Sequence, residues 1–441
     1  MSNQIPRVVV LGGGFAGFHA AKNLARRLRD EAEIVLVNST DYFLYLPLLP
    51  QVTSGVLDPR RITVPLAASL PGVQVRLGEV RGVDLERSSV HYADLDGGEH
   101  DLGYDRLVVA IGSVNKLLPI PGVAEHAHGF RGMPEALYLR DHILGELEMV
   151  PDTDDPVERA ARCTFVVVGA GYTGTEVAAQ GALLTERITK DRPELAGRPI
   201  RWLLLDVKDR VLPELDPKLS ATANRVLRER GVEVRTGTSV TEATSEGVRL
   251  STGEYLPTRS LIWCVGVRPD PLVQDLGLPV ERGRIVVDAE MAVPDHPGVY
   301  AVGDAAAVPD PRNPGSATPM TAQHAQRHGK TVARNVAASL GHGTPASYTH
   351  RDMGFVVDLG GRDAAANPLH IALPRPLARV VTSGYHLAAM PGNRIRTGAE
   401  WLLDKVLPRQ RVRLGLVRPE AVPLDTASPE LAAVEKRPGA R

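Results

Sequence analysis

The sequence predicts an α/β protein with two Rossmann-like three-layer domains and a further C-terminal segment. The spacing Gly-x-Gly-x-x-Gly occurs twice, from residues 12 and 169, each time between an apolar strand and an Ala-rich helix. A third observation is a short apolar strand that runs into Gly303-Asp304. The 441 residues are enough for two or three domains, and 43% apolar content is that of a folded protein.

The first Gly-rich unit lies near the N-terminus. The strand RVVVL at residues 7–11 is followed by GGGFAG, the helix FHAAKNLARRLRD and a second strand, EIVLVN. Gly12 permits the tight turn, Gly14 lets a pyrophosphate approach the backbone, and Gly17 lets helix and strand pack closely. The phosphates then lie at the positive end of the helix. We therefore place a dinucleotide against Gly12, Gly14, Phe15, Ala16 and Gly17.

The second unit repeats this pattern in TFVVVGAGYTGTEVAAQGALL, which holds Gly169, Gly171 and Gly174. The polar stretch TERITKDRPELAGRP, before the next strand IRWLLLD, predicts an extended helix and a loop. Two fingerprints need two dinucleotides, and a flavin enzyme reduced by a nicotinamide accounts for both. The Gly303-Asp304 turn agrees, because in two-dinucleotide flavoproteins this Asp binds the ribityl or phosphate region of the flavin.

The residue that ends the second strand differs between the two units. In the second unit it is Asp206, which accepts from the 2′-OH of NADH and repels the 2′-phosphate of NADPH. Lys208 and Arg210 lie close in sequence, so NADPH stays open as the less favoured cofactor. In the first unit it is Asn38, which lacks the usual charge but still hydrogen-bonds a ribose hydroxyl.

Composition excludes several classes of function. The net charge of −1 gives no general attraction to nucleic acid. The two cysteines, Cys163 and Cys264, lie in apolar strand-like runs without a Cys-x-x-Cys pair, so we expect inert buried thiols, no metal site and no redox disulfide. Few cysteines suit the cytoplasm. No uncharged run of 18 apolar residues occurs, so no membrane-spanning helix is expected.

Five segments carry a resemblance to a known family. They are NSTDYFLYLPLLPQVTSG around Pro47, YDRLVVAIGSVNKLLPIPG with Ala110 and Gly112, GYTGTE with Glu176, LIWCVGVRPDPLV with Gly266, and TAQHAQRHGK at residues 321–330. Together they resemble the type II NADH:quinone oxidoreductases of the pyridine nucleotide-disulphide oxidoreductase superfamily, which implies cofactor contacts at Pro47, Ala110, Gly112 and Gly266. Residues 38–60 hold no cysteine, so disulfide reduction and sulfide oxidation are disfavoured.

The resemblance implies a discontinuous FAD-binding domain, residues 1–150 and 281–365, with an NAD(P)H-binding domain, residues 151–280, inserted in it. A C-terminal segment, 366–418, and a tail rich in Pro, Ala and charge, 419–441, follow, and we expect the tail to be disordered. Non-covalently bound FAD takes hydride from NADH and passes two electrons to a menaquinone- or ubiquinone-type quinone, without proton pumping. A homodimer is a further implication of the resemblance.

The segment TAQHAQRHGK resembles the quinone site of the family. We expect a helix to begin near Thr321 and to face the pyrimidine end of the flavin with its positive end. Thr321 and Gln323 lie closest to the ring, and Ala322 leaves room for a flat quinone. The second Gln of the family pattern Ala-Gln-x-Ala-x-Gln is replaced by Arg327. That cation either stabilises a reduced quinone anion or binds an acidic acceptor instead.

Three titratable residues have open roles. Glu176, near the start of the second Gly-loop helix, is either an ordinary helix-start acid or, as the resemblance implies, a residue between nicotinamide and flavin that orients the carboxamide or responds to reduction. His324 and His328 add proton donors to the quinone segment, but we expect both to be solvated helix residues.

Residues 375–418 carry nine Lys or Arg and two acids, with Leu, Val and Trp between them. Such a segment can attach a cytoplasmic protein to the inner face of the cytoplasmic membrane. Few aromatic anchors and several prolines leave a basic packing or dimer helix as the alternative. Two other functions also stay open: a soluble FAD-dependent NAD(P)H reductase of another acceptor, which Arg327 favours, and a redox-sensing flavoprotein.

Overall fold

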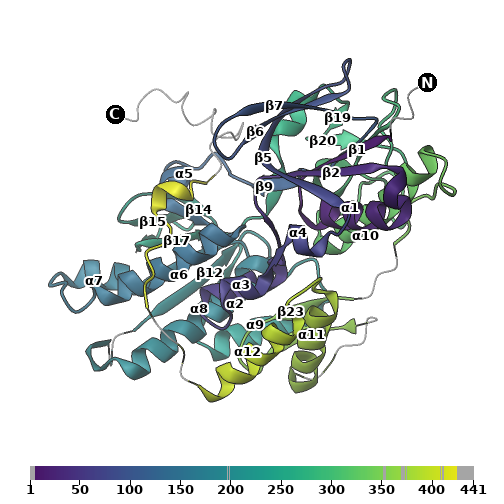
Figure 1. Ribbon diagram of the computed structural model, residues 1–441. Helices are drawn as coiled ribbons and strands as arrows, with labels where there is room; N and C mark the ends of the chain where they lie inside the picture. The colour runs from purple at the N-terminus through teal and green to yellow at the C-terminus, as the bar shows by residue number, and fades with distance from the viewer. Residues whose placement is uncertain are drawn as a thin grey trace, which may run out of the picture. The chain divides into compact units, whose positions relative to one another are not determined.

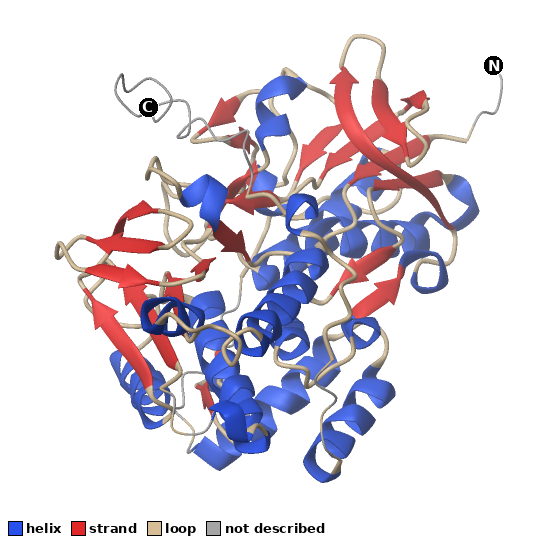
Figure 2. Cartoon of the chain, turned by 90° about the vertical axis from the view of Figure 1, so that its left-hand side faces the viewer, coloured by secondary structure: helices blue, strands red, loops and turns tan. Residues whose placement is uncertain are grey.

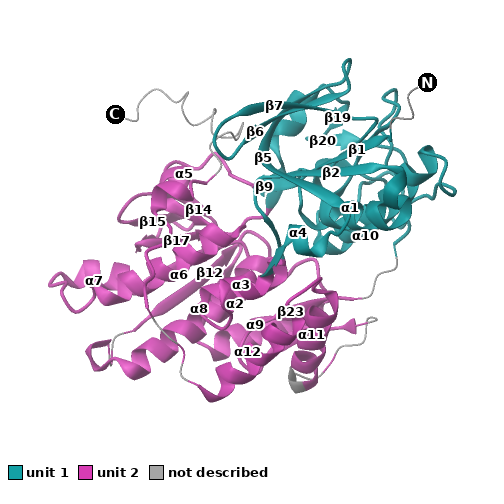
Figure 3. Cartoon of the chain, in the orientation of Figure 1, with its two compact units in different colours: residues 1–44, 63–114, 267–351 teal, residues 45–62, 115–266, 352–441 magenta. Residues whose placement is uncertain are grey.

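The computed structural model describes residues 5–195, 197, 199–350, 354–368, 373, 375–407, 409 and 412–424. Most of the predicted tail, residues 425–441, lies outside the described residues. The chain divides into two compact units (Figure 3): unit 1 comprises residues 1–44, 63–114 and 267–351, and unit 2 comprises residues 45–62, 115–266 and 352–441. Each unit combines parallel strands with helices. Figure 2 shows both kinds of element in the chain, so the predicted α/β class is confirmed.

Unit 1 is built on a seven-stranded sheet (Figure 1). In spatial order its strands are β21 (Val299–Ala301), β8 (Arg106–Val109), β1 (Arg7–Leu11), β2 (Glu33–Asn38), β5 (Val73–Asp84), β6 (Ser89–Asp94) and β7 (Glu99–Gly103). The strands from β21 to β5 run parallel, and β6 and β7 extend the sheet as an antiparallel meander. Residues 8–11 have no exposed surface, as expected for a parallel sheet covered on both faces.

Helix α1 (Phe15–Leu28) follows β1 and packs against α10 (Ala322–Ser339), the helix predicted from TAQHAQRHGK. This packing explains the glycine in that segment, because a Cβ at Gly329 would lie 2.2 Å from the carbonyl oxygen of Ala16. The shorter elements of unit 1 are η1 (Arg29–Glu31), β3 (Tyr42–Leu44), β4 (Thr63–Pro65), α4 (Leu66–Ser69), β18 (Val267–Pro269), η4 (Pro271–Leu276), β19 (Val280–Glu281), β20 (Arg284–Val286), η5 (Gly303–Ala305) and β22 (Ala306–Ala307). Strand β9 (Ser113–Asn115) spans the change from unit 1 to unit 2.

Unit 2 is built on a five-stranded parallel sheet. In spatial order its strands are β10 (Ala127–Gly129), β17 (Ser260–Trp263), β11 (Thr164–Val168), β12 (Arg201–Asp206) and β13 (Val232–Thr236). Helix α8 (Tyr172–Asp191) follows β11 and has 20 residues, which confirms the expected extension. A Cβ at Gly181 would lie 2.2 Å from the Trp202 ring, so this glycine lets α8 lie on the sheet.

The remaining elements of unit 2 surround this sheet. They are η2 (Leu46–Leu48), α2 (Leu49–Thr53), α3 (Pro59–Ile62), α5 (Val123–His126), α6 (Met133–Glu148), α7 (Pro156–Arg162), η3 (Pro193–Leu195), α9 (Pro217–Glu229), β14 (Val240–Ala243), β15 (Gly247–Leu250), β16 (Tyr255–Pro257), β23 (Val356–Asp358), β24 (Ala364–Ala366), α11 (Arg375–Ala389), α12 (Arg394–Val406) and η7 (Pro419–Ala421). Helix α2 packs against α6 and α8. Within the described residues, no helix has the length and apolar character needed to cross a membrane.

Candidate functional site

The first Gly-rich loop joins β1 to α1 in unit 1. Gly12 has φ +91°, and its N–H donates to the Val37 carbonyl at 2.9 Å. A Cβ on Gly17 would lie 1.8 Å from the Gly12 carbonyl oxygen, so this position accepts no side chain. At Gly14, by contrast, a Cβ would meet nothing within 4 Å. The fold therefore requires Gly12 and Gly17, whereas Gly14 leaves open space beside the backbone.

The second loop joins β11 to α8 in unit 2 and has the same geometry. Gly169 has φ +101° and donates to the Leu205 carbonyl at 2.8 Å. A Cβ on Gly174 would lie 1.8 Å from the Gly169 carbonyl oxygen, and a Cβ on Gly171 would meet nothing within 4 Å. Each loop thus pairs two structurally required glycines with one that leaves open space beside the backbone.

In each unit, the residue that follows a third parallel strand packs against the first glycine of the Gly-rich loop. The Ala110 carbonyl lies 2.4 Å from an added Cβ on Gly12, and the Cys264 carbonyl lies 2.2 Å from one on Gly169. Two residues later the chain turns at a glycine with positive φ, +84° at Gly112 and +104° at Gly266. Both cysteines are free, and burial raises the pKa of the Cys264 thiol to about 12, so it is a poor nucleophile as expected.

The N-termini of α1 and α8 fit an anionic ligand. Their N-cap residues are Gly14 and Gly171, neither end has a side-chain cap, and neither first turn holds an acid. Other helices of the chain are closed by their own side chains: Asp155 accepts from the Val157 N–H, and Asp216 accepts from the Lys218 N–H. Uncapped N–H groups at the positive helix end, beside an open glycine, match the pyrophosphate of a dinucleotide.

The residues that end β2 and β12 both hold their Gly-rich loop. Asn38 Oδ1 accepts from the Gly13 N–H at 2.6 Å, and Asn38 Nδ2 donates to the Thr40 carbonyl at 2.8 Å. Asp206 accepts from the Ala170 N–H at 2.6 Å.

Two residues close to Asp206 in the sequence, Lys208 and Arg210, carry cations. The Lys208 backbone N–H donates to Asp206 at 2.8 Å, and the Arg210 guanidinium donates to the Pro213 carbonyl at 2.8 Å. This Arg210 contact supplies the guanidinium with an acceptor from the chain itself, which supports the preference for NADH.

The Gly303-Asp304 turn lies in unit 1 beside α10. Gly303 has φ +70° and its N–H donates to His328 Nδ1 at 3.3 Å, while Asp304 accepts from the Ser113 hydroxyl at 2.7 Å. Thr321 is the N-cap of α10 and its hydroxyl accepts from the His324 N–H at 3.3 Å. The helix therefore begins where the sequence predicted, and one of its side chains holds the Gly-Asp turn.

The prediction that His324 and His328 are solvated is wrong. Their residues are 8% and 1% exposed, and burial lowers their pKa values to about 4 and about 3. His324 Nδ1 lies 2.8 Å from the Tyr348 hydroxyl, and the His328 ring meets the Tyr348 ring edge-on. The burial comes from the segment after α10, which local helical spacing does not reveal.

Arg327, which replaces the second Gln of the quinone pattern, points along its own helix. Its Nη1 donates to Gln323 Oε1 at 3.4 Å and lies 2.9 Å from His350 Nδ1. The residue that departs from the pattern is thus hydrogen-bonded to the residue that keeps it.

Glu176 lies in a buried polar network of unit 2. Its Oε1 accepts from the Asp358 backbone N–H at 2.8 Å. The Asp358 carboxylate, 3% exposed, accepts from Gln51, Arg379 and the Gly360 N–H. Burial, followed by the nearby Asp358 charge, raises the pKa of Glu176 well above its usual range, which favours the protonated form of its carboxyl.

The C-terminal helices complete this network. Arg379 comes from α11, and Trp401 Nε1 of α12 donates to Gln51 Oε1 at 2.6 Å. The Tyr45 hydroxyl lies 3.2 Å from His386 Nδ1 of α11. Pro47 lies in η2, between Tyr45 and Gln51 in the sequence. The sequence analysis did not select Gln51, although this residue lies inside the PLLPQVTSG segment that resembles the family. Asp358 and Arg379 lie in no such segment, so nothing in the sequence indicated their place in the network.

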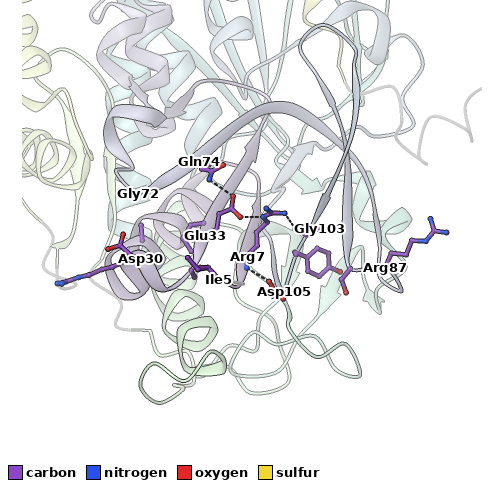
Figure 4. Close-up of a pocket in the computed structure, with 15 residues that line it drawn as sticks. Ile5, Arg7, Asp30, Glu33, Gly72, Gln74, Arg87, Gly103 and Asp105 are labelled. Atoms are coloured by element: carbon purple, nitrogen blue, oxygen red, sulfur yellow. Dashed lines mark hydrogen bonds and ion pairs between the residues drawn. The ribbon is translucent and has the colours of Figure 1, made fainter. Parts of the chain in front are cut away.

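A polar hollow lies in unit 1 (Figure 4). Arg7 and Glu33 form an ion pair at 2.6 Å there, and Asp105 accepts from the Arg7 N–H at 2.6 Å. These residues stand at the amino ends of the parallel strands, whereas Gly12 follows the carboxyl end of β1. The hollow is therefore at the opposite edge of the sheet from the Gly-rich loop.

Comparison with known proteins gives a consistent family. The family model described as pyridine nucleotide-disulphide oxidoreductase matches residues 6–329. The type II NADH:quinone oxidoreductase Ndh of Mycobacterium tuberculosis is 32% identical over 422 residues, which cover 92% of this chain and 89% of the relative. The type II NADH:quinone oxidoreductase of Staphylococcus haemolyticus is 28% identical and covers 82% of this chain and 90% of its own length.

Solved structures agree at the level of the fold. The NDH2 structure from Plasmodium falciparum in complex with NADH has a TM-score of 0.84 and 18% identity, and the match covers 93% of this chain and all of that one. The paired Gly-rich loops, the Gly-Asp turn and these similarities lead to one conclusion. The chain belongs to the pyridine nucleotide-disulphide oxidoreductase family and, within it, to the type II NADH:quinone oxidoreductases.

Proposed function

We propose that this protein catalyses NADH + H⁺ + quinone → NAD⁺ + quinol through non-covalently bound FAD, without proton pumping. The observation that carries the proposal is the pair of Gly-rich loops, each with an open glycine and an uncapped helix N-terminus. Bound FAD would supply the group that accepts hydride and then releases two electrons. The chain's own residues bind, orient and hold protons.

In this proposal the FAD-binding domain is residues 1–150 and 281–365, and the NADH-binding domain is residues 151–280. FAD lies against the first loop, Asn38, the Ala110-x-Gly112 turn and Asp304. NADH lies against the second loop, Asp206 and Gly266. The Asp206 carboxylate, whose oxygens already accept two backbone N–H groups, has further lone pairs for the 2′-OH of the ribose.

Glu176 is proposed to act as a neutral carboxyl on the nicotinamide side. A protonated carboxyl has one O–H donor. The Asp358 N–H donates to Oε1 of Glu176 and so fixes the orientation of the carboxyl. Such a group can donate to the carboxamide of the nicotinamide and respond to a change of charge on reduction. Asp358, Gln51 and Arg379 position it through the network described above.

Gln323 and Arg327 are proposed to bind the quinone oxygens. Ala322 leaves room for a flat ring, and Thr321, the N-cap of α10, marks the positive helix end that we place next to the flavin. The Arg327 guanidinium, held by Gln323 and His350, supplies a cation that stabilises a reduced quinone oxygen. The same cation supports the second candidate, in which a small acidic redox protein accepts the electrons.

Membrane contact is proposed for residues 375–418, at the inner face of the cytoplasmic membrane. Apolar side chains that are at least one third exposed gather on α11, α12 and the segment after them: Leu377, Val380, Tyr385, Ile395, Leu402, Leu403, Val406, Leu407, Val412, Leu414 and Leu416. Exposed apolar residues interleaved with an excess of cations suit an anionic lipid surface. The same surface offers a contact for a homodimer.

Stopped-flow reoxidation of the NADH-reduced protein tests the proposed acceptor. Menaquinone analogues should oxidise the bound flavin faster than oxygen or a ferredoxin-like carrier does. Arg327→Gln, which restores the family pattern, should keep quinone reoxidation and slow an acidic carrier, whereas Arg334→Gln, an exposed change on the same helix, should alter neither. Quinones no faster than oxygen would rule out the quinone assignment, and slow reoxidation by every acceptor would point to a redox sensor.

A further inference from the structure

Arg284 is a partly buried cation of unit 1 that the reaction described above does not use. It begins β20, the middle strand of a small sheet whose neighbours are β19 and β22. Its cross-strand neighbour Glu281 lies 3.9 Å from Arg282, an exposed residue of the connecting turn. The nearest carboxylate along the hairpin is thus engaged at the surface by another arginine.

Among the residues that the structure describes, the guanidinium of Arg284 has one hydrogen-bond partner. Its Nη1 donates to the Thr318 carbonyl at 2.9 Å. Its Nε and Nη2 atoms are enclosed and meet no hydrogen-bond acceptor in the part of the chain that the structure describes. Burial lowers the pKa of Arg284, but arginine stays charged in proteins, so these N–H groups are donors on a cation. Enclosed N–H groups of a cation that lack an acceptor are destabilising, which indicates that an anionic or strongly polar oxygen belongs there.

The surroundings of Arg284 are those of the proposed flavin site. β20 pairs in parallel with β22, the strand that directly follows the Gly303-Asp304 turn. The Asp304 charge acts on Arg284 and raises its pKa against the effect of burial, while the Asp304 carboxylate itself accepts from the Ser113 hydroxyl. The same Thr318 whose carbonyl binds Arg284 has its hydroxyl 3.5 Å from His328 Nε2. Arg284 therefore stands where the Gly-Asp turn and the start of α10 meet.

We propose that Arg284 is a further FAD-binding residue, whose guanidinium donates to an anionic oxygen of the cofactor. The inference rests on the proposed function, because FAD is the ligand assigned to unit 1. Two parts of FAD carry such an oxygen: the pyrophosphate in every redox state, and the pyrimidine end of the ring after reduction. Removing the cation weakens the binding of oxidised FAD in the first case and disfavours the reduced form in the second.

The test uses Arg284→Gln with Arg282→Gln as the matched control on the same hairpin, and two readouts besides turnover. One readout is the FAD dissociation constant of the deflavinated protein, and the other is the midpoint potential of the bound flavin. A phosphate contact predicts that FAD binding by Arg284→Gln weakens about 10- to 100-fold at an unchanged potential. A ring contact predicts a more negative potential with oxidised FAD bound as in the control. Arg284→Lys, which keeps the charge, should restore part of either effect.

Thermal unfolding separates a ligand contact from a structural role. In the deflavinated protein Arg284→Gln should unfold at the control temperature or above, because it removes a cation whose Nε and Nη2 groups are enclosed without an acceptor in the described part of the chain. In the FAD-loaded protein it should unfold below the control. Equal FAD affinity and potential in Arg284→Gln and Arg282→Gln, or an equal loss of stability with and without FAD, would overturn the inference. A parent protein that binds no FAD would instead overturn the proposed function itself.

Discussion

The two Gly-rich loops of this chain have the same backbone and different side chains around it. In each loop the first and third glycines are enclosed by backbone, and the middle glycine faces open space. The strand-end residue binds the next backbone N–H of the loop at 2.6 Å in both, although it is an amide in one unit and a carboxylate in the other. The comparison teaches that the loop needs an acceptor oxygen at this point and does not need its charge. The loop therefore does not depend on the charge of Asp206, and we infer that this charge discriminates between NADH and NADPH.

The helices that follow the loops show a second parallel. The fifth residue of α1 is His19 and the fifth residue of α8 is Glu176, so each first turn is followed by a titratable group. Burial, followed by the charges of Lys330 and Lys22, lowers the pKa of His19 to about 3, and burial raises that of Glu176. Both shifts favour the neutral form of the side chain. The raised pKa of Glu176 disfavours a negative charge near the end of the helix proposed to bind a phosphate.

The largest expected effect comes from the enclosed glycines. Gly17→Ala places a Cβ 1.8 Å from a carbonyl oxygen, so we expect a loss of about 3 kcal/mol or more in the free energy of unfolding, or no folded protein. Gly14→Ala meets no atom within 4 Å and should leave the deflavinated protein as stable as the parent while FAD binding falls. Urea unfolding and FAD titration measure the two effects. A stable Gly17→Ala protein would contradict the packing described for this loop.

Local sequence predicted the backbone of the Gly-rich loops and helices, but not which side chains are buried. The loop glycines, the extended α8 and the start of α10 at Thr321 follow from spacing and capping patterns within 30 residues. The solvated state predicted for His324 was wrong, because the Tyr348 segment buries it. Burial of a helix face depends on a partner that helical spacing cannot name.

The network around Glu176 shows the same limit. The other members of the network are Gln51, Asp358 and Arg379, which come from three separate segments of the chain. Each is an ordinary polar residue in its own context. The sequence left two roles open for Glu176, and the fold supplies the neighbours that raise its pKa. Long-range contacts of this kind need the topology first.

The next largest effect tests the division of labour at Asp206. Asp206→Ala removes both the loop contact and the ribose acceptor, so NADH binding should weaken about 10- to 100-fold. Asp206→Asn keeps an oxygen for the Ala170 N–H, so the loop should hold while the preference for NADH over NADPH narrows. Steady-state KM values for both nucleotides, with the thermal unfolding temperature as control, give the answer. An unchanged preference in both variants would show that another residue reads the ribose.

A smaller effect, opposite in sign for the two helices, concerns pH. The folded pKa of His19 is depressed, so the unfolded chain binds more protons as pH falls from about 6.5 towards about 3, and the fold loses stability. Relative to His19→Gln, the parent should therefore lose about 2 kcal/mol between pH 7 and pH 5.

For Glu176 the folded pKa is raised, so the fold loses stability as pH rises above the unfolded value of about 4.5 and through the folded one. Glu176→Gln should thus gain stability over the parent with increasing pH, with the exposed Glu186→Gln on the same helix as control. Urea unfolding from pH 5 to pH 9 measures both slopes. Parallel curves for Glu176→Gln and the parent would show that Glu176 is not held neutral.

The smallest effect is expected from giving the first loop the charge of the second. Asn38→Asp keeps the acceptor for the Gly13 N–H but loses the Nδ2 donor to the Thr40 carbonyl, so the deflavinated protein should lose about 1 kcal/mol. Against this, the new carboxylate adds a ribose acceptor, and FAD affinity should hold or rise. Asn38→Ala, which removes both contacts, should cost more stability and more FAD affinity than Asn38→Asp. If instead the charged variant is the worse of the two, charge at this position acts on the loop itself, and the two loops are less alike than their backbones indicate.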